Sequence, residues 1–427
     1  MTHPRVCIVG GGASGLVCAR VLASQDYQCE PTIFEQNPFI GGQWNYNDDG
    51  TSETTAVYKN LRTNLPCSVM QFTDFPFPND PPESYVSIKE MHEYLIAYAK
   101  LHELEKYLLL NTKIYSIDET FTVTYTQSDN DLPQRTNQKL IEKHENYAIY
   151  SEQFDAICVA NGHYSKIYIP SDIPGFNTHT FPIIHSHSYR EPESYQNKSI
   201  IVVGASHSGI DICGELTSVA KHVILSMKEE NIENFNIVLN LLRQSGKHLC
   251  TDNLSTNFSI APIIERIEND TVYFQNQTSF QPDLLIFATG YEYQMPFLQG
   301  KLQIDENRLQ KNHYVYPLYK QLFHGDYPDG HLSFLAIPFR IVPFPLAEIQ
   351  SHIVARVLTG KLSLPTREQM FNELENLSLP QNHNYHCVNM IEYANDLFQL
   401  MSESNKYFGY KFTIDECRRI RKVSPQQ

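Results

Sequence analysis

The length, composition and charge of the chain limit what it can be. Its 427 residues are enough for two or three domains, and a hydrophobic content of 41% is typical of a globular protein with a substantial core. The 33 basic and 48 acidic side chains give a formal net charge of −15, which argues against a nucleic acid or an anionic membrane as the main partner.

The cysteines and the apolar runs bear on the cellular compartment. The nine cysteines form no CxxC pair and no cluster with metal-ligand spacing, so we expect reduced structural thiols and no metal site. The apolar run from Val6 to Val9 passes directly into glycines, unlike the core of a signal peptide. No stretch approaches the roughly 20 apolar residues that a spanning helix needs. We therefore expect a cytoplasmic protein without a membrane span.

The chain opens with a βαβ pattern. The residues from Arg5 to Val9 predict a strand, those from Leu16 to Leu22 a helix, and those from Pro31 to Glu35 a second strand. The intervening Gly10-Gly11-Gly12-Ala13-Ser14-Gly15 has the spacing of a dinucleotide-binding loop. A bare GxGxxG is often only a turn, but the strand, the helix and a following acid together favour a cofactor site.

Each position of this first loop has an expected task. Gly10 permits the tight turn, and Gly12 lets backbone N–H groups of the stretch through Ala13 and Ser14 approach a pyrophosphate at the helix start. Gly15 allows close packing of the helix, and Glu35 accepts hydrogen bonds from a ribose.

A second βαβ pattern occupies Ser199 to Val203, Ile210 to Leu216 and His222 to Ser226. Its loop, Gly204-Ala205-Ser206-His207-Ser208-Gly209, has Ser206 where the middle glycine is usual, and a Cβ there crowds a phosphate unless the Ser206 or Ser208 hydroxyl compensates. We expect cofactor contacts from Gly204, Ser206, His207, Ser208 and Gly209. Ser226 and Lys228 stand in place of an acid and suit a 2′-phosphate, which favours NADPH over NADH, although Lys228 could equally be a solvated surface charge.

The segments between and after the two patterns suggest how they are joined. Ile88 to Leu110 predicts an amphipathic helical region, and Ile114 to Tyr150 predicts a layer of strands around a polar insert. Phe154 to Ala160 and Asp283 to Ala288 predict buried strands at which the chain leaves the first domain and returns to it. The fold class expected is α/β, with two Rossmann-like dinucleotide-binding domains, the second inserted into the first.

Taken together, the motifs resemble the flavin-containing monooxygenases, class B flavoprotein monooxygenases, especially their short soluble fungal-like and bacterial members. The resemblance runs nearly end to end and rests on Gly10 to Gly15, Gly41-Gly42-Gln43-Trp44, Tyr58 to Asn64, Phe72-Thr73-Asp74-Phe75-Pro76, His185 to Glu191, and Ala288-Thr289-Gly290-Tyr291. It implies that residues 1–166 and 288–427 bind FAD and that residues 167–287 bind NADPH.

The resemblance also implies roles for single residues. Gln43 and Trp44 would lie along the FAD, and Asn64, preceded by Arg62 and Thr63, would be the catalytic amide over the flavin ring that meets nicotinamide and oxygen. A neutral amide suits this role because it donates hydrogen bonds without adding a charge. Alternatively, Asn64 caps a turn beside Pro66. Thr289, Gly290 and Tyr291 would let the backbone pass close to a dinucleotide, and Gln350 would complete the FAD site, although a polar helix face explains Gln350 equally well.

The chain departs from the family's identifying stretch F-x-G-x-x-x-H-x-x-x-F/Y. His185 and Tyr189 are in register, whereas His179 and Phe181 replace the usual Phe and Gly. We expect His185 to be structural rather than a catalytic base. The aromatic set Tyr314, Tyr316, Tyr319 and Phe323 is more typical of core than of a substrate route.

The activity that the resemblance implies is NADPH- and O₂-dependent. NADPH reduces FAD, and O₂ adds to give a C4a-hydroperoxyflavin that oxygenates the nitrogen or sulfur of small amines, thiols or thioethers. A Baeyer–Villiger ketone oxygenase, an uncoupled NADPH oxidase and a flavin-binding regulatory protein without turnover remain alternatives, while a disulfide reductase is disfavoured because CxxC is missing. The expected partners are O₂ and a small nucleophilic substrate, and the question of a homodimer stays open.

Overall fold

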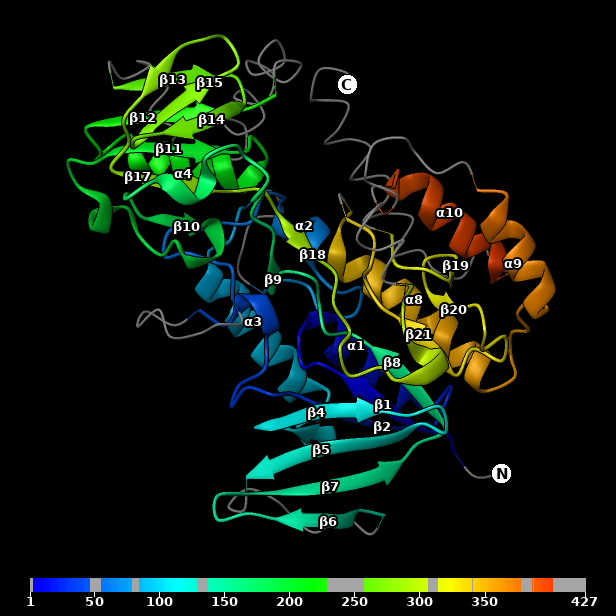
Figure 1. Cartoon of the computed structure of the whole chain (residues 1–427). Helices are drawn as coiled ribbons and strands as arrows, with labels where there is room; N and C mark the ends of the chain where they lie inside the picture. The colour runs from blue at the N-terminus through cyan, green and yellow to red at the C-terminus, as the bar shows by residue number, and fades with distance from the viewer. Residues whose placement is uncertain are drawn as a thin grey trace.

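The computed structural model describes residues 3–46, 55–78, 84–128, 137–228, 257–305, 314–339, 341–377, 386 and 388–401. Its two largest sheets, of seven and five strands, each carry one of the predicted glycine loops (Figure 1). The strands of the second sheet lie in sequence between strands of the first. The predicted α/β fold, with two Rossmann-like units and the second inserted, is confirmed.

The first unit is built on the seven-stranded sheet. Its order is β19-β20-β21-β8-β1-β2-β3, in which β21, β8, β1, β2 and β3 run parallel and β20 and β19 are antiparallel additions. The strands are β1 (Arg5–Val9), β2 (Glu30–Phe34), β3 (Leu108–Leu109), β8 (Ala156–Val159), β19 (Leu318–Tyr319), β20 (Phe323–His324) and β21 (Leu332–Phe334).

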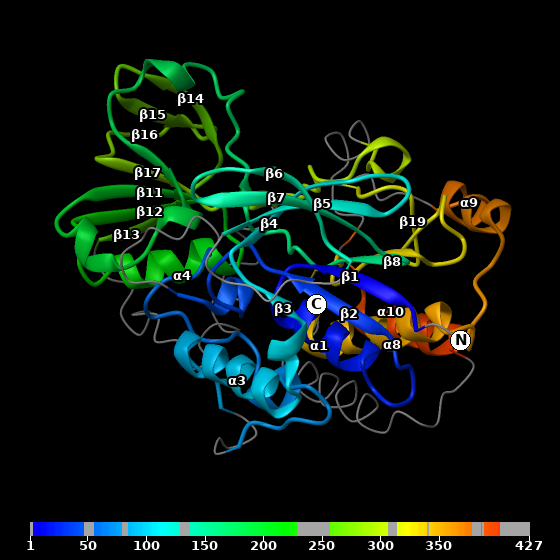
Figure 2. The ribbon, with the colours of Figure 1, turned by 90° about the horizontal axis from the view of Figure 1, so that it is seen from below.

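Successive side chains of β1 point to opposite faces of this sheet and show what covers each face. Val6 and Ile8 pack into a cluster with helices, whereas Cys7 and Val9 pack into a cluster with a second, four-stranded sheet. Figure 2 shows the helices and that sheet on opposite sides. The helices are α1 (Ala13–Leu22), α3 (Ile88–Leu101), α8 (Pro343–Leu358) and α10 (Met390–Leu400), and the strands are β4 (Thr112–Ile117), β5 (Thr122–Ser128), β6 (Lys139–Lys143) and β7 (Tyr147–Gln153).

The second unit repeats this plan at smaller size. Its sheet is parallel throughout, in the order β10-β17-β11-β12-β13. Ile200 and Val202 pack toward the helix α4, and Ile201 packs toward a three-stranded antiparallel sheet on the other face. The elements are β10 (Ile183–His185), β11 (Ser199–Val203), α4 (His207–Leu216), β12 (His222–Ser226), β13 (Phe258–Ala261), β14 (Ile264–Glu268), β15 (Thr271–Phe274), β16 (Ser279–Phe280) and β17 (Leu284–Phe287).

The chain passes between the units at β9 (Lys166–Ile167) and β18 (Tyr291–Glu292), which pair with each other antiparallel. In Figure 1 this short pair lies between the two sheets. We propose domain boundaries at 166/167 and 287/288, which fall at β9 and directly after β17. The other elements are α2 (Cys67–Met70), α9 (Arg367–Glu375), η1 (Gly42–Trp44), η2 (Leu104–Tyr107), η3 (Phe176–Thr178), η4 (Ser186–Ser188), η5 (Pro192–Tyr195) and η6 (Gly300–Leu302).

One helix is shorter than predicted. The segment from Ile88 to Leu110 is α-helical only to Leu101, because Glu103 takes a left-handed φ of 50°. A short 3-10 helix, η2, follows, and the apolar pair Leu108–Leu109 joins the edge of the first sheet as β3. The predicted strand layer from Ile114 to Tyr150 is confirmed as β4 to β7, although part of its polar insert, residues 129–136, lies outside the described residues.

The aromatic and cysteine side chains behave as core residues. Tyr314, Tyr316, Tyr319 and Phe323 are buried, as expected. The described cysteines Cys7, Cys18, Cys29, Cys67, Cys158 and Cys213 are buried free thiols, while Cys250, Cys387 and Cys417 lie outside the described residues. None of the helices in the described ranges has the length and apolar character to cross a membrane.

Candidate cofactor-binding site

The first glycine loop is held in shape by backbone contacts that exclude side chains. Gly10 has a φ of +109°, and a Cβ on it would lie 2.6 Å from the carbonyl oxygen of Ala160, at the end of β8. A Cβ on Gly15 would lie 1.9 Å from the carbonyl oxygen of Gly10. The tight turn at Gly10 and the close helix packing at Gly15 therefore both require glycine.

The second glycine loop has the same geometry. Gly204 has a φ of +108°, a Cβ on it would lie 2.5 Å from the carbonyl oxygen of Ala288, and a Cβ on Gly209 would lie 1.8 Å from the carbonyl oxygen of Gly204. Ala160 and Ala288 thus close the two loops in equivalent ways, each just after the parallel strand beside the loop.

The middle position of each loop has an extended backbone without strain. Gly12 has φ −77° and ψ −175°, and Ser206 has nearly the same φ −87° and ψ −177°, so serine fits the second loop without backbone cost. Neither residue caps its helix with a side chain, and the first turns of α1 and α4 contain no acidic residue. Ser206, His207 and Ser208 are exposed, whereas Ala13 and Ser14 are half-buried. Both helix starts therefore fit an anionic group.

The Glu35 side chain is hydrogen-bonded to the first loop. Its Oε2 accepts a hydrogen bond of 2.7 Å from the Gly11 N–H, and its Oε1 accepts from the Asn37 backbone and side chain at 2.8 and 2.7 Å. Burial raises the pKa of Glu35, against these hydrogen bonds, which lower it. These hydrogen bonds fix the Glu35 carboxylate beside Gly11, next to the loop at which we expect the cofactor.

The turn at residues 41–44 lies against the first loop. Gly41 donates its N–H to the Gly11 carbonyl at 3.0 Å, and a Cβ on Gly12 would lie 3.6 Å from the Gly42 Cα. Trp44 packs edge-on against Phe344 in the first turn of α8, with ring centres 6.5 Å apart. Gln43 turns the other way, where its Oε1 accepts from the Ala56 N–H at 2.8 Å. The Gln43 side chain thus ties this turn to the segment that leads to Asn64.

Asn64 is exposed, and the two residues before it are anchored. Thr63 is buried, and its backbone and hydroxyl bond to Val86, while Arg62 donates to the Tyr85 carbonyl at 2.8 Å. Within the described chain the Asn64 side chain has no hydrogen-bond partner, and it is exposed. The amide is therefore accessible to a ligand on a backbone that is held in place.

The polar groups of two predicted cofactor residues form hydrogen bonds within the protein. Gln350 is fully buried, with its Oε1 accepting from the Ala336 N–H at 2.8 Å and its Nε2 donating to the Tyr393 hydroxyl at 3.0 Å. Ser226 is also fully buried and donates its hydroxyl to the Pro262 carbonyl at 2.8 Å. In this conformation both side chains are buried and hydrogen-bonded within the protein, so Gln350 does not lie on an exposed polar helix face either. Lys228 is exposed, and its contact with a 2′-phosphate stays a prediction.

Two imidazole rings contact Tyr291 in the stretch after the second unit. The Thr289 hydroxyl donates to the Tyr168 carbonyl, and Gly290 has a φ of +87° with open space around it. Tyr291 meets the ring of His185 edge-on at 5.0 Å and that of His187 at 5.9 Å. Burial lowers the pKa of His185 to about 4, and its Nδ1 accepts from the His187 N–H at 3.1 Å. A buried neutral histidine that receives a backbone hydrogen bond fits the structural role expected for it.

The two residues that depart from the identifying stretch contact each other. The Nδ1 atom of His179 lies 2.7 Å from the carbonyl oxygen of Phe181, and their rings stack with centres 4.6 Å apart. Phe181 is buried in the cluster under the second sheet. The replacements therefore form a local packing unit at the edge of the second unit.

Sequence reasoning missed the residues that connect the units. Tyr58 donates its hydroxyl to Asp211 in α4, and both side chains are buried. The signal available in the sequence was an acid between Ile210 and Ile212 on an apolar helix, but nothing in the sequence names its partner.

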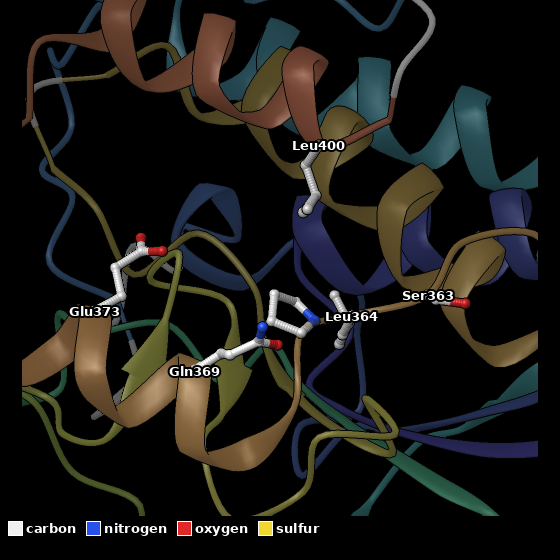
Figure 3. Close-up of a pocket in the computed structure, with 6 residues that line it drawn as sticks. Ser363, Leu364, Gln369, Glu373 and Leu400 are labelled. Carbon is white, nitrogen blue, oxygen red and sulfur yellow. The ribbon is translucent and has the colours of Figure 1, made fainter.

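A cavity of about 460 Å³ lies apart from these loops. Figure 3 shows it between α9 and the end of α10. Its lining residues are Ser363, Leu364, Pro365, Gln369, Glu373 and Leu400. Because none of the predicted cofactor residues contributes to it, we assign it no part in cofactor binding.

The chain is similar to known proteins over nearly its whole length. The profile of the family described as flavin-binding monooxygenase-like matches residues 3–233 and 246–416. The chain is 30% identical to flavin-containing monooxygenase FMO GS-OX-like 2 of Arabidopsis thaliana, over 100% of the chain and 88% of that protein, and 33% identical to FMO GS-OX-like 8 of the same plant, over 88% and 79%.

Solved structures give the same grouping. The S-allyl-L-cysteine S-oxygenase of Allium sativum superposes with a TM-score of 0.77 at 28% identity, covering 100% of this chain and 94% of that one. Cyclohexanone monooxygenase, at 13% identity and a TM-score of 0.59 over 95% and 99%, shares the fold. The two equivalent nucleotide loops and these matches lead to one conclusion: the chain belongs to the flavin-binding monooxygenase-like family and is a monooxygenase that uses FAD and NADPH.

Proposed function

We propose that the protein oxygenates the sulfur or nitrogen of small soft nucleophiles, such as thioethers, thiols and amines, with NADPH and O₂. The observation that carries the proposal is the pair of equivalent loops at Gly10–Gly15 and Gly204–Gly209, connected by a segment that ends at the exposed Asn64 amide. When bound, the flavin supplies hydride acceptance and oxygen activation, and the protein supplies binding and orientation.

The chain's own residues would divide that work between the two units. The start of α1, with Gly12, Ala13 and Ser14, would hold the FAD pyrophosphate, and Glu35 would accept from the ribose. The start of α4, with Ser206, His207 and Ser208, would hold the NADPH pyrophosphate, and Lys228 would meet the 2′-phosphate. Asn64 would donate its amide N–H to the group that carries the reacting oxygen.

A sulfur substrate is supported by one of the structural relatives. The Allium sativum protein, which matches this chain over its full length, is described as an S-oxygenase of S-allyl-L-cysteine, a thioether. The cyclohexanone monooxygenase likeness supports only the fold at its 13% identity, so ketone oxygenation is the second candidate and is separated from the first by product analysis.

Two further properties are proposed with the activity. We place the protein in the cytoplasm, which its described buried free thiols support because a reducing compartment preserves them. We also propose that the protein forms a homodimer. Light scattering coupled to gel filtration would measure its mass in solution.

The decisive experiment follows the flavin absorbance in two steps. The purified FAD-loaded protein is reduced anaerobically with NADPH and then mixed with aerated buffer, with and without a thioether. We expect a transient absorbance distinct from oxidised and reduced flavin, which the thioether discharges with formation of its sulfoxide. Direct return to oxidised flavin with peroxide release, with or without the thioether, would instead identify an NADPH oxidase.

A further inference from the structure

A buried hydrogen bond joins the two nucleotide-binding units. Tyr58 belongs to the first unit by sequence, yet its ring lies in the hydrophobic cluster of the second unit beside Tyr189, with ring centres 5.5 Å apart. Its hydroxyl donates to Oδ2 of Asp211 in α4. The exposed fractions of Tyr58 and Asp211 are only 3% and 9%. Burial raises the pKa of Tyr58 well above its usual value, which keeps the hydroxyl protonated as the donor.

Arg190 holds the same segment from the side of the second unit. Its guanidinium donates to the carbonyls of His187 at 2.6 Å and Tyr189 at 3.0 Å, and also reaches those of Thr55 at 3.3 Å and Val57 at 3.5 Å. Its own carbonyl accepts from the Lys59 N–H at 2.9 Å. A planar fork with several donors suits this set of carbonyls, which an ammonium could not bridge at once.

The clamped segment touches both cofactor cradles. At one end, Thr55 and Ala56 bond to Gln43, which follows the glycines packed against the first loop. In the middle, Asp211 lies on α4, the helix that begins at the second loop. At the other end, the segment leads through Thr63 to the exposed Asn64. The clamp therefore connects the second unit to the segment that leads to Asn64.

We propose that Tyr58, Asp211 and Arg190 are positioning residues that fix the NADPH-binding unit relative to the Asn64 segment, so that the nicotinamide reaches the flavin in a productive arrangement. The inference rests on the proposed function. Hydride transfer depends steeply on the placement of donor and acceptor, and a displacement of about 1 Å can lower a rate by roughly a hundredfold. A buried hydrogen bond to a carboxylate is short and directional, which suits a contact that sets a distance.

The test compares variants that lose the contact with variants that keep it. Tyr58→Phe removes the donor and Asp211→Leu removes the acceptor, whereas Asp211→Asn leaves an amide oxygen that accepts from Tyr58. Lys59→Met is the matched control, because it breaks the solvent-exposed 2.9 Å ion pair with Glu191 in the same segment. We expect the anaerobic rate of flavin reduction by NADPH to fall roughly tenfold in Tyr58→Phe and Asp211→Leu, with FAD content unchanged, and to stay within about twofold in Asp211→Asn and Lys59→Met.

A second readout is independent of the bound cofactors. In FAD-free protein, hydrogen exchange at the Lys59 amide, which donates to Arg190, should be faster in Tyr58→Phe and Asp211→Leu than in the wild type. Wild-type reduction rates and wild-type exchange in both variants would overturn the proposal, as would an equal loss in Asp211→Asn and Asp211→Leu. Arg190→Lys, which keeps the charge and loses the fork, decides the question in the same way if Tyr58→Phe does not fold. If NADPH fails to reduce the wild type, the proposed function falls, while the exchange data still decide whether the contact holds the segment.

Discussion

Because the two glycine loops have the same geometry, we predict that a single glycine-to-alanine substitution in one loop will disable the nucleotide site of that loop and spare the other site. In Gly15→Ala the new Cβ would lie 1.9 Å from the Gly10 carbonyl oxygen, and in Gly209→Ala it would lie 1.8 Å from that of Gly204. Contacts of a Cβ below 3.0 Å are essentially never seen, so helix and loop must separate by more than 1 Å, and both atoms belong to backbone that cannot swing aside.

The size of the effect follows from that displacement. Inserting a methyl group into close-packed backbone costs typically 1–3 kcal/mol, and moving the helix start away from a bound pyrophosphate weakens binding by roughly 10- to 100-fold. We expect Gly15→Ala to lose FAD and Gly209→Ala to retain FAD but lose affinity for NADP⁺. Gly162→Ala is the control, because its Cβ meets nothing within 4 Å and only its φ of +70° resists the change, at a cost of about 1 kcal/mol.

The assay measures flavin content by absorbance, the NADP⁺ dissociation constant by calorimetry and the free energy of unfolding in urea. The reasoning fails if Gly15→Ala retains FAD with wild-type affinity, or if Gly209→Ala loses FAD and keeps its NADP⁺ affinity. A loss of both cofactors in both variants, together with a large drop in stability, would show that the two units do not respond separately.

Three further predictions concern single side chains. Asn64→Ala should bind both cofactors normally but convert roughly a hundredfold less substrate per NADPH, with peroxide released instead, as peroxide and product assays will show. Lys228→Ala should raise the KM for NADPH roughly tenfold and leave that for NADH unchanged, and an equal rise for both would place Lys228 away from the 2′-phosphate. Burial lowers the pKa of His386 to about 3, and its Nε2 accepts from the Val315 N–H at 2.9 Å. Below pH about 6.5 this histidine therefore takes up a proton in the unfolded chain but stays neutral in the folded chain. As the pH is lowered from there, this group decreases the free energy of unfolding by roughly 1.4 kcal/mol per pH unit. Urea unfolding between pH 7 and 5 should show a shallower slope for His386→Gln, and an unchanged slope would contradict the assignment.

Local patterns in the sequence located both glycine loops and their flanking strands. β1, β11 and β12 begin and end where the apolar runs predicted, because strand alternation and the glycine turn depend on neighbouring residues. The same reasoning overextended the helix that begins at Ile88, because Glu103 takes a left-handed conformation and the edge strand Leu108–Leu109 forms by pairing with the distant strand β2.

The tertiary structure alone decided how the polar groups of the site are used. The amide of Gln350 and the hydroxyl of Ser226 have the right chemistry for a cofactor, yet packing gives their hydrogen bonds to Ala336, Tyr393 and Pro262. The type of a side chain determines which hydrogen bonds it can donate or accept. Its packing in the fold determines which of those hydrogen bonds are still available to a ligand.

The sequence by itself determined that there are two dinucleotide loops and that the chain resembles flavin-containing monooxygenases, because both follow from motifs only a few residues long. It could not determine that Ala160 and Ala288 close those loops or that Tyr58 meets Asp211 across 153 positions. Such contacts arise when strands and helices far apart in the chain pack together, and the residue pattern near each partner carries no information about the other.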